Sequence, residues 1–354
     1  MTLLADGFTF PGIATRVVFG SGTLVHVGDE VRRLGRSRAL VLSTPHQGAE
    51  AVSLARGLGD LAVATFTEAE MHTPVAVTER AVAAYRAAGA DCVVALGGGS
   101  TIGLGKAIAT RTGADQVVVP TTYAGSEMTD ILGETEAGRK TTRRDPSIRP
   151  EVVVYDVDLT LGLPRAMTVT SALNAIAHGV EALYAPDANP VTSLMAVDGI
   201  RAFRDGLPVV VAHPADREAR AQVLYGAWLC SVALGYTTMS LHHKLAHVLG
   251  GSFGLPHAET HAILLPHTAG FNAVATDRLS GVADLLGGSV GGGLWEFARS
   301  LGAPLRLADL DLGEADLDRA AAIATENRYA NPRAFGEGDI RALLQAAWDG
   351  ARPD

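Results

Sequence analysis

Histidines are concentrated in two parts of this 354-residue chain, because seven of the eleven lie at His178 or within residues 242–267. Residues 173–183 read LNAIAHGVEAL and place Asn174 four residues before His178, which puts both side chains on one face of a predicted helix. His243 and His247 have the same spacing, and His257 follows fourteen residues after His243. A helical His-x-x-x-His pair can share one metal ion, and a third histidine would complete a three-histidine site.

Two interpretations of these histidines stay open. A single histidine on an apolar helix is usually a hydrogen-bonded core residue, and this is the simpler interpretation of His242, His261 and His267. The density of the cluster favours a chemical role for the other histidines. A carboxylate would be a better metal ligand than the amide of Asn174, so the chain holds either a catalytic metal or the shell of a metal site that serves another chemistry.

A glycine-rich turn indicates a phosphate-binding site. Residues 91–109, DCVVALGGGSTIGLGKAIA, predict a strand, a turn made by Gly97, Gly98, Gly99 and Ser100, and then a helix. Backbone N–H groups at a helix N-terminus bind phosphate well, and glycines let a ligand approach closely. The spacing is neither GxGxxG nor that of a P-loop, and a tight packing turn is the alternative interpretation. The flanking strand and helix favour phosphate binding.

Two further loops follow predicted strands and carry hydroxyl groups. In VPTTYAGSEMTD (119–130), Thr121, Thr122 and Ser126 could contact the ribose and nicotinamide of a dinucleotide, although Ser/Thr/Gly loops are commonly just loops. In RALVLSTPHQG (38–48), Ser43 and Thr44 stand where a nucleotide-binding sheet often places an acid for the adenine ribose. No acid occurs there to repel a 2′-phosphate, so we expect that NADPH is accepted as well as NADH.

The order of predicted elements indicates how these residues are positioned. From Arg16 to Pro120, apolar strand-like runs alternate with helical patterns, which predicts a mainly parallel sheet whose loops bind ligands at the carboxyl ends of the strands. A strand-like EVVVYD (151–156) follows a charged loop. Long helical patterns dominate after Pro164, so we place a domain boundary near Leu161–Pro164 and expect LGGSVGGG (286–293) to join two helices.

Composition narrows the function classes. The chain is 47% hydrophobic and 19% charged with a net charge of −9, which leaves no basic field for nucleic acid or an anionic membrane surface. No apolar stretch reaches a transmembrane length and the N-terminus does not resemble a signal peptide, so we expect a cytoplasmic protein. Cys92 and Cys230 lie far apart without a CxxC, and we expect both to be small buried apolar residues.

These motifs together resemble the iron-containing alcohol dehydrogenase family, also called group III. The matching segments are FGSGT near residue 20, GGGS at 97–100, PTTYAGSE at 120–127, LNAIAHGVEAL, the His-x-x-x-His helix with the PH after it, and NPR at 331–333. The resemblance implies the dehydroquinate synthase-like fold. This fold has an α/β NAD(P)-binding domain, here residues 1–162, an all-α domain, here 163–354, and an active site in the cleft between them. It also implies a homodimer.

The resemblance also implies roles for particular residues. An aspartate and three histidines hold the metal in that family, and the corresponding residues here are Asn174, His178, His243 and His257. The amide at the first position binds a dication less well than a carboxylate, although three neutral histidines hold zinc in other proteins. We expect no metal. Lys140, in GRKTT, matches the family position beside the nicotinamide-side ribose.

Several stretches look more like one branch of the family, the maleylacetate reductases. They are residues 133–164, residues 170–190 and HHKLAHVLGG at 242–251. That branch reduces the C=C bond of 2-maleylacetate to 3-oxoadipate with NADH or NADPH, late in aromatic ring degradation, and its members are generally regarded as not needing the metal. The resemblance therefore implies an NAD(P)H-dependent oxidoreductase whose substrate is a small dicarboxylate.

The residues suit this chemistry. Hydride addition to an enone generates an enolate, which hydrogen-bond donors or cations can stabilise without a metal. His243, His257 and Lys244 are candidates for binding the carboxylates, next to His247 in the same cluster, and His178 and Asn174 for orienting the substrate. His243 is our candidate for the proton donor. Arg143 and Arg144 could attract the dianion, but a solvated charge run explains them equally well.

Two rival activities remain at this point. A metal-dependent alcohol dehydrogenase of the same family would carry an aspartate at position 174. A dehydroquinate synthase-like lyase would bind NAD but regenerate it in each turnover, so it would cause no net loss of NADH absorbance.

Overall fold

The computed structural model describes residues 7–137 and 139–354, with only the backbone described for Arg139 and Lys140. The chain divides into two compact units. One is Gly12–Leu163, and the other is Pro164–Asp354 together with residues 7–11 of the N-terminal segment. Residues 7–11 therefore lie outside the α/β unit, in which the sequence analysis had placed them. The ring of Phe10 contacts that of Tyr236, with 5.3 Å between centroids, which explains why this segment belongs to the helical unit.

The first unit is built on a six-stranded parallel sheet, as the alternating pattern predicted. Its strands lie in the order β1-β8-β5-β4-β2-β3. Their bounds are β1 Arg16–Gly20, β2 Ala39–Leu42, β3 Ala62–Phe66, β4 Cys92–Gly97, β5 Asp115–Pro120 and β8 Val152–Asp156. The four interior strands β8, β5, β4 and β2 are buried nearly throughout, which accounts for their continuous apolar runs.

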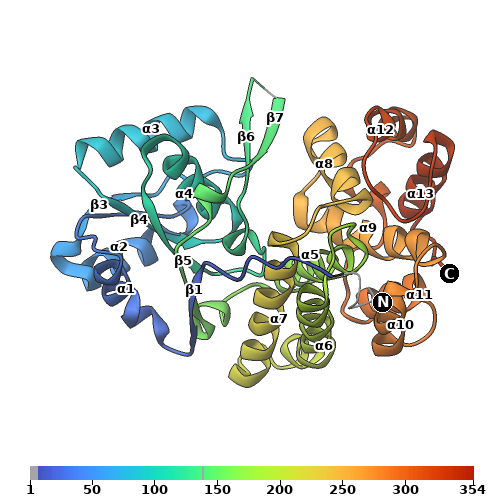
Figure 1. Ribbon diagram of the computed structural model, residues 1–354, viewed down its shortest axis with the longest axis horizontal. Coiled ribbons are helices and arrows are strands. Elements are labelled where there is room, and N and C mark those ends of the chain that lie inside the picture. The colour runs from blue at the N-terminus through green and yellow to red at the C-terminus, as the bar shows by residue number, and fades with distance from the viewer. Residues whose placement is uncertain (1–6, 138) are drawn as a thin grey trace. The chain divides into compact units, whose positions relative to one another are not determined.

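Helices cover both faces of this sheet (Figure 1). They are α1 Val27–Arg33, α2 Gly48–Leu58, α3 Val75–Ala87 and α4 Gly99–Thr112. One apolar core joins α1 and α2 to alternate residues of the strands, such as Val94, Val117 and Val154. Since successive strand residues point to opposite faces, the residues between them face α3 and α4. Cys92 and Cys230 are free and buried, as expected.

The segment expected to be a charged loop is instead an antiparallel hairpin of β6 (Ile131–Glu136) and β7 (Arg139–Arg144). The reason is that its acids are buried and paired with arginines. Glu134 is 5% exposed and pairs with Arg111 at 2.9 Å and Arg143 at 3.7 Å. The neighbouring Asp130 pairs with Arg144 at 3.2 Å. Arg143 and Arg144 are thus partners of buried acids, which neither sequence interpretation foresaw.

The second unit consists of helices in the residues that the structure describes. They are α5 Arg165–Tyr184, α6 Pro190–Ala212, α7 Arg217–Gly235, α8 Leu241–Phe253, α9 His257–Ala273, α10 Ser280–Leu286, α11 Val290–Ser300, α12 Asp316–Thr325 and α13 Glu337–Asp349. Short 3₁₀ turns lie in both units, at Thr23–His26, Pro45–Gln47, Gly59–Leu61, Ser126–Met128, Pro146–Ile148, Val157–Thr160, Asp277–Leu279 and Leu307–Leu310. Of the segment 286–293, only residues 287–289 join α10 to α11, because Leu286 ends α10 and residues 290–293 form the first turn of α11.

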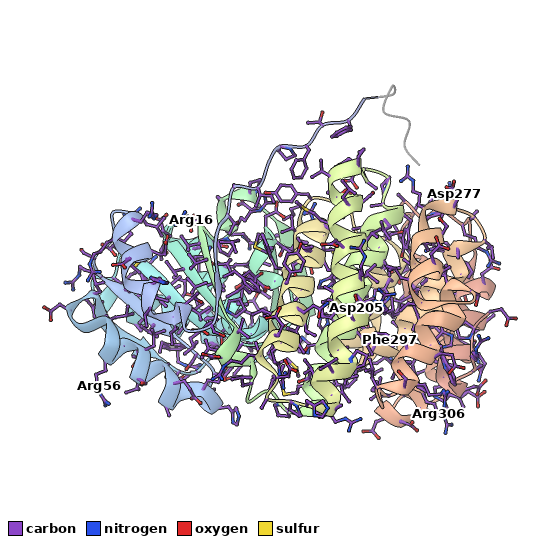
Figure 2. All side chains as sticks on the ribbon, turned by 90° about the horizontal axis from the view of Figure 1, so that it is seen from below. Arg16, Arg56, Asp205, Asp277, Phe297 and Arg306 are labelled. Carbon is purple, nitrogen blue, oxygen red and sulfur yellow. The ribbon has the colours of Figure 1, made fainter. Side chains whose placement is uncertain are left out.

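Helix α5 is the centre of the helical unit. It packs against α6, α7 and α9, and every residue from Thr168 to Tyr184 is buried. A helix without an exposed face lies inside a protein core, so the polar residues of LNAIAHGVEAL must find partners within the protein. Charged side chains such as Arg56, Asp277 and Arg306 lie at the surface of their units (Figure 2). No helix among the described residues is long and apolar enough to span a membrane.

Helices α6 and α7 approach each other backbone to backbone at two glycines. A Cβ added to Gly226 would lie 2.8 Å from the carbonyl oxygen of Gly199, and one added to Gly199 would lie 2.7 Å from Sγ of Cys230. Neither backbone can yield without moving a helix. The close crossing of α6 and α7 therefore requires glycine at both positions.

We predict that Gly226→Ala lowers the free energy of unfolding by about 1–3 kcal/mol, because the added methyl overpacks this crossing. Gly251 is the matched control, since it is an exposed helical glycine with open space around its Cα. Gly251→Ala should leave stability unchanged or raise it by about 0.5–1 kcal/mol. Thermal unfolding midpoints of the two variants and the parent measure the difference. Equal midpoints for both variants would show that the crossing tolerates the methyl.

Candidate functional site

Three loops that the sequence singled out meet at the carboxyl ends of the adjacent strands β5, β4 and β2. Gln47, after β2, donates from Nε2 to Oγ1 of Thr121, after β5, at 3.1 Å. The N–H of Thr121 in turn donates to the carbonyl of Gly97, the last residue of β4, at 3.2 Å. The ends of parallel strands are where such sheets bind ligands. The structure therefore gathers these predicted cofactor loops into one place.

The backbone of the glycine-rich turn can be approached by a ligand because its glycines have no side chains. Neighbouring atoms also leave no space for a Cβ at two of these glycines. Gly97 has a φ of +154°, and a Cβ there would lie 2.4 Å from Oγ1 of Thr101. A Cβ on Gly98 would lie 2.9 Å from Oγ1 of Thr122. The backbone runs directly into the N-terminus of α4 at Gly99, where the helix dipole favours negative charge. This geometry suits the pyrophosphate of a dinucleotide.

The other residues predicted to bind the cofactor differ in their burial and in their hydrogen-bond partners. Ser43 is fully buried, and its hydroxyl donates to the carbonyl of Thr44 at 3.0 Å. Ser100 lies in the first turn of α4 and is half-buried, and Ser126 contacts the buried Lys106. Lys140 pairs through its backbone with Thr135 in the hairpin, and its side chain lies outside the described residues.

Sequence reasoning missed two residues of this α/β site. Gln47 joins two of the loops, and Thr101 has a buried hydroxyl oxygen without a partner directly beside Gly97. Gln47 lies within the quoted loop 38–48 and Thr101 directly follows GGGS, so both lie in or next to motifs that the sequence already indicated. What the sequence lacked was the strand order that brings the loops together.

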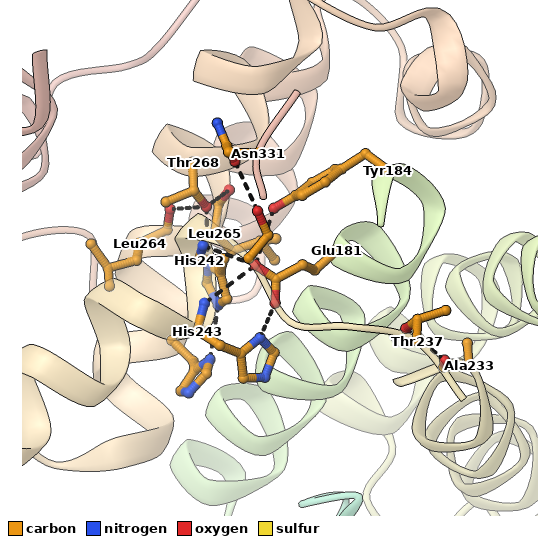
Figure 3. A network of polar contacts seen from close by, with 12 residues as sticks. Glu181, Tyr184, Ala233, Thr237, His242, His243, Leu264, Leu265, Thr268 and Asn331 are labelled. Carbon is orange, nitrogen blue, oxygen red and sulfur yellow. Dashed lines mark hydrogen bonds and ion pairs between the residues drawn. The ribbon is translucent and has the colours of Figure 1, made fainter. Parts of the chain in front are cut away.

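In the helical unit, a buried carboxylate organises the histidines (Figure 3). Glu181, on α5, is 1% exposed and accepts a hydrogen bond from Nδ1 of His243. Its other oxygen accepts from the backbone N–H groups of His242, at 2.9 Å, and of His243, at 3.4 Å, in the first turn of α8. The hydroxyl of Tyr184 donates to the same oxygen at 3.4 Å. One side chain thus satisfies the start of α8 and orients its histidine.

The ionised form of Glu181 is stabilised. Burial alone would raise its pKa, but the charge of the facing His243 and the hydrogen bonds from that residue outweigh burial and lower the pKa. Since a carboxylate can only accept, Nδ1 of His243 carries the proton and Nε2 is left to face other groups. This is the carboxylate–imidazole arrangement that stabilises positive charge on a ring during proton transfer.

The other histidines gather around His243. Its ring centroid lies 5.2 Å from that of His178, 6.0 Å from that of His247 and 5.0 Å from that of His261. The ring centroid of His257 lies 4.3 Å from that of His261. The structure therefore brings together the histidines predicted for the site. Lys244 is half-exposed, and its side chain leaves α8 about 100° around the helix axis from that of His243.

A second hydrogen-bonded chain fixes two histidines that the sequence suggested were plain core residues. The hydroxyl of Thr268 donates to the carbonyl of Leu264 at 3.0 Å, so it accepts from Nδ1 of His242 at 2.9 Å. Nε2 of His242 must then accept from Nδ1 of His261 at 2.8 Å. This leaves a lone pair on Nε2 of His261, a buried atom without a partner. His242 and His261 are thus buried, hydrogen-bonded residues, as their simpler interpretation expects, and they are bonded to each other.

These imidazoles are kept neutral by their surroundings. Burial, helped by neighbouring histidines, lowers the pKa of His178 and His261 well below the usual value. Burial and the nearby His243 lower the pKa of His242 to about 3. His243 differs from them because it alone bonds to an ionised carboxylate. The cluster thus contains one imidazole paired with a carboxylate and several that burial keeps neutral.

The NPR segment at residues 331–333 supports the start of α8 through side-chain hydrogen bonds. Asn331, in the NPR segment, accepts from Ser240 at 3.0 Å, and Ser240 precedes the first residue of α8. The amides of Asn331 and Asn272 also bond to each other in both directions, at 2.7 and 3.0 Å. The NPR segment therefore fixes where α8 begins, which in turn places His242 and His243.

The residues implied for a metal offer three imidazoles and an amide, without the carboxylate of the family pattern. Oδ1 of Asn174 and Nδ1 of His178, in the middle of α5, are buried and have no hydrogen-bond partner. The donor set has no carboxylate, and Glu181 is already used by His243. Across the described residues, no three His, Cys, Asp or Glu side chains are placed to hold one ion. The orphaned atoms suit an organic ligand with its own hydrogen-bonding groups.

Family models match both units of the chain. The model described as "Iron-containing alcohol dehydrogenase" matches residues 14–157, and "Fe-containing alcohol dehydrogenase family, C-terminal" matches residues 168–348. Among similar proteins, the maleylacetate reductase of Rhizobium sp. (strain MTP-10005) is 60% identical, with 98% of this chain and 99% of that protein covered. Maleylacetate reductase 1 of Rhodococcus opacus is 49% identical, with 98% of each covered.

A solved structure agrees with this likeness. The maleylacetate reductase from Agrobacterium tumefaciens, whose crystal structure has been solved, has 59% sequence identity to this chain. The two structures superpose with a TM-score of 0.95, covering 98% of this chain and 99% of that one. The family resemblance that the motifs indicated is confirmed. Since both of its units match, this chain belongs to the iron-containing alcohol dehydrogenase family and is an NAD(P)H-dependent oxidoreductase.

Proposed function

We propose that this chain reduces the C=C bond of 2-maleylacetate to 3-oxoadipate, with NADH or NADPH as the hydride donor, in the degradation of aromatic compounds. The observation that carries the proposal is the ionised Glu181 paired with His243, next to an amide at position 174. This arrangement can deliver a proton and bind an anion without a metal. The names of the relatives, maleylacetate reductases at 49–60% identity, support the same reaction.

The site divides the reaction between its residues. A reduced nicotinamide held by the loops of the α/β unit would supply hydride to the carbon of the C=C bond farther from the ketone, which would leave an enolate. Positive charge on His243, stabilised by Glu181, favours this enolate. The Nε2–H of His243 then gives its proton to the carbon next to the ketone, which completes the single bond. The products are the saturated ketone and NAD(P)⁺.

The dianionic substrate needs hosts for its two carboxylates. Asn174 and His178 have unpartnered polar atoms and are proposed to orient the substrate. His257 and Lys244 are half-exposed, and we propose that they bind a carboxylate. His247, whose ring lies beside that of His243, is proposed to line the same site. Nε2 of His261 is buried without a partner, and in the tautomer described above it is proposed to accept a hydrogen bond from the substrate.

We propose that the cofactor occupies the loops of the α/β unit. The pyrophosphate would lie against Gly97–Ser100, and Thr121, Thr122 and Ser126 would contact the nicotinamide side. Lys140 would contact the nicotinamide-side ribose. No acid faces the adenine ribose at Ser43 and Thr44, so both NADH and NADPH are proposed to bind.

The assembly and location are proposals as well. We propose a homodimer, as the family resemblance implies, that binds neither nucleic acid nor membranes, which the net charge of −9 supports. We propose a cytoplasmic location, which is supported by two cysteines that are both free and buried.

Chelator-treated protein, shown by metal analysis to be free of iron and zinc, should oxidise NADH with freshly generated maleylacetate at the untreated rate. The reason is that the proposed mechanism uses only the side chains of this chain. The matched sample is the same protein refilled with iron or zinc, which should be no faster. Activity that returns only with metal would overturn the metal-free mechanism, and turnover of alcohols instead would support the dehydrogenase rival.

Glu181→Gln should lower kcat for maleylacetate by about 100-fold or more, because the amide cannot stabilise positive charge on His243. The KM for NADH should stay within about twofold, since Glu181 has no part in the proposed cofactor site. Steady-state kinetics of the variant give both values. Glu218→Gln, an exposed change on α7, is the control and should match the parent. An unchanged kcat in a folded Glu181→Gln protein would contradict the role of the pair.

A further inference from the structure

A fully buried lysine that the proposed mechanism does not use lies in the α/β unit. Lys106, on α4, is 0% exposed, and the three N–H donors of its ammonium are shared among four acceptors. They are the carbonyl of Ser126 at 2.5 Å, the hydroxyl of Ser126 at 3.2 Å, that of Thr129 at 3.0 Å and the carbonyl of Ile131 at 3.0 Å. All four acceptors belong to the segment 126–131, which follows β5 and enters the hairpin.

Keeping this charge buried is costly. Burial lowers the pKa of Lys106 to about 7, against the opposing effect of the nearby acids Glu127 and Asp130. Glu127 is itself fully buried, and it accepts from the hydroxyl of Tyr155 at 2.9 Å. A buried charged group persists where its hydrogen bonds specify one arrangement, and an apolar side chain of similar volume would pack at less cost. The arrangement specified here is the path of residues 126–131.

The position of that segment connects Lys106 to the cofactor. Helix α4 begins at the glycine-rich turn after β4, which suits the pyrophosphate. The strand order is β5-β4-β2, so the two halves of a dinucleotide centred on β4 extend over β2 and β5. The β2 side carries Ser43 and Thr44, the place of the adenine ribose. The nicotinamide half therefore lies over the β5 side, where Ser126 is held by Lys106.

We propose that Lys106 is a positioning residue for the nicotinamide half of the cofactor, because it ties the segment 126–131 to the helix that holds the pyrophosphate. The proposal rests on the NAD(P)H dependence in the proposed function. It assigns to Lys106 no contact with the cofactor. Its effect passes through Ser126 and the backbone on either side, so loss of the ammonium should disturb one half of the cofactor more than the other.

The test compares NADH with ADP-ribose, which lacks the nicotinamide, by measuring dissociation constants for both ligands. Lys106→Met keeps an unbranched side chain as far as Cε and removes the donors at Nζ. We expect NADH to bind about tenfold more weakly, as loss of hydrogen bonds to a charged group allows. ADP-ribose should bind within about twofold of the parent. Equal weakening of both ligands, or no change in either, would overturn the proposal.

A matched control separates positioning from general stability. Gln116 is also fully buried, and its amide oxygen lies 3.4 Å from the position of a Cβ on Gly105 of the same helix, but it lies at the amino end of β5. Gln116→Met should therefore lower stability while changing the two dissociation constants by the same factor. A selective loss of NADH binding in Gln116→Met would contradict the proposal.

A milder variant keeps the test decisive if Lys106→Met does not fold. Thr129→Val removes one hydroxyl acceptor and leaves the ammonium in place. It should weaken NADH about threefold, since one of four contacts is lost, with ADP-ribose unchanged. Equal effects on both ligands would overturn the proposal here too. Since these assays contain no maleylacetate, a parent protein that binds NADH but does not reduce maleylacetate would refute the proposed reaction and leave the role of Lys106 intact.

Discussion

The contact on which the helical unit depends is the one between the Glu181 carboxylate and the start of α8. A buried carboxylate is unfavourable unless several donors surround it, and here the donors are two backbone N–H groups, an imidazole and a phenol. Removing one partner from such a buried pair typically costs about 3–5 kcal/mol. The same contact therefore fixes the first turn of α8, the ring of His243 and the charge that this ring can carry.

Other features of the cluster follow from this contact. Because α8 is held at its first turn, His242 comes within reach of both Thr268 and His261 on α9. That chain ends at a threonine hydroxyl that donates to the backbone. Neighbouring imidazoles of the same chemical type thereby acquire different hydrogen-bonding roles. His243 faces a carboxylate, and His261 presents a lone pair.

The α/β unit relies on a different physical constraint, which is the absence of side-chain atoms where backbone segments meet. At Gly97 and Gly98, an added methyl would collide with Thr101 and Thr122. The loops can therefore approach one another only because these two residues are glycine. Lys106 contributes the opposite kind of constraint, since its ammonium bonds to several acceptors of the segment 126–131 and fixes where that segment lies.

The sequence by itself determined much of the protein. Continuous Val-rich runs between helical patterns predicted the parallel sheet, and their spacing is a local property of the chain. The two ligand spacings, at Asn174–His178 and His243–His247, were also local, because residues four apart on a helix share a face. Together with the GGGS turn and the NPR segment, these local patterns were specific enough to indicate the family.

Only the tertiary structure decided which residues act together. Glu181 lies inside the quoted segment LNAIAHGVEAL, yet its importance depends on a helix that begins sixty residues later. The tautomers of His242 and His261 depend on the hydroxyl of Thr268, and the hairpin at 131–144 depends on acids that are buried only after folding. Hydrogen-bond partners and burial are non-local quantities. A sequence pattern records local geometry, and for that reason it could predict the elements but not the contacts between them.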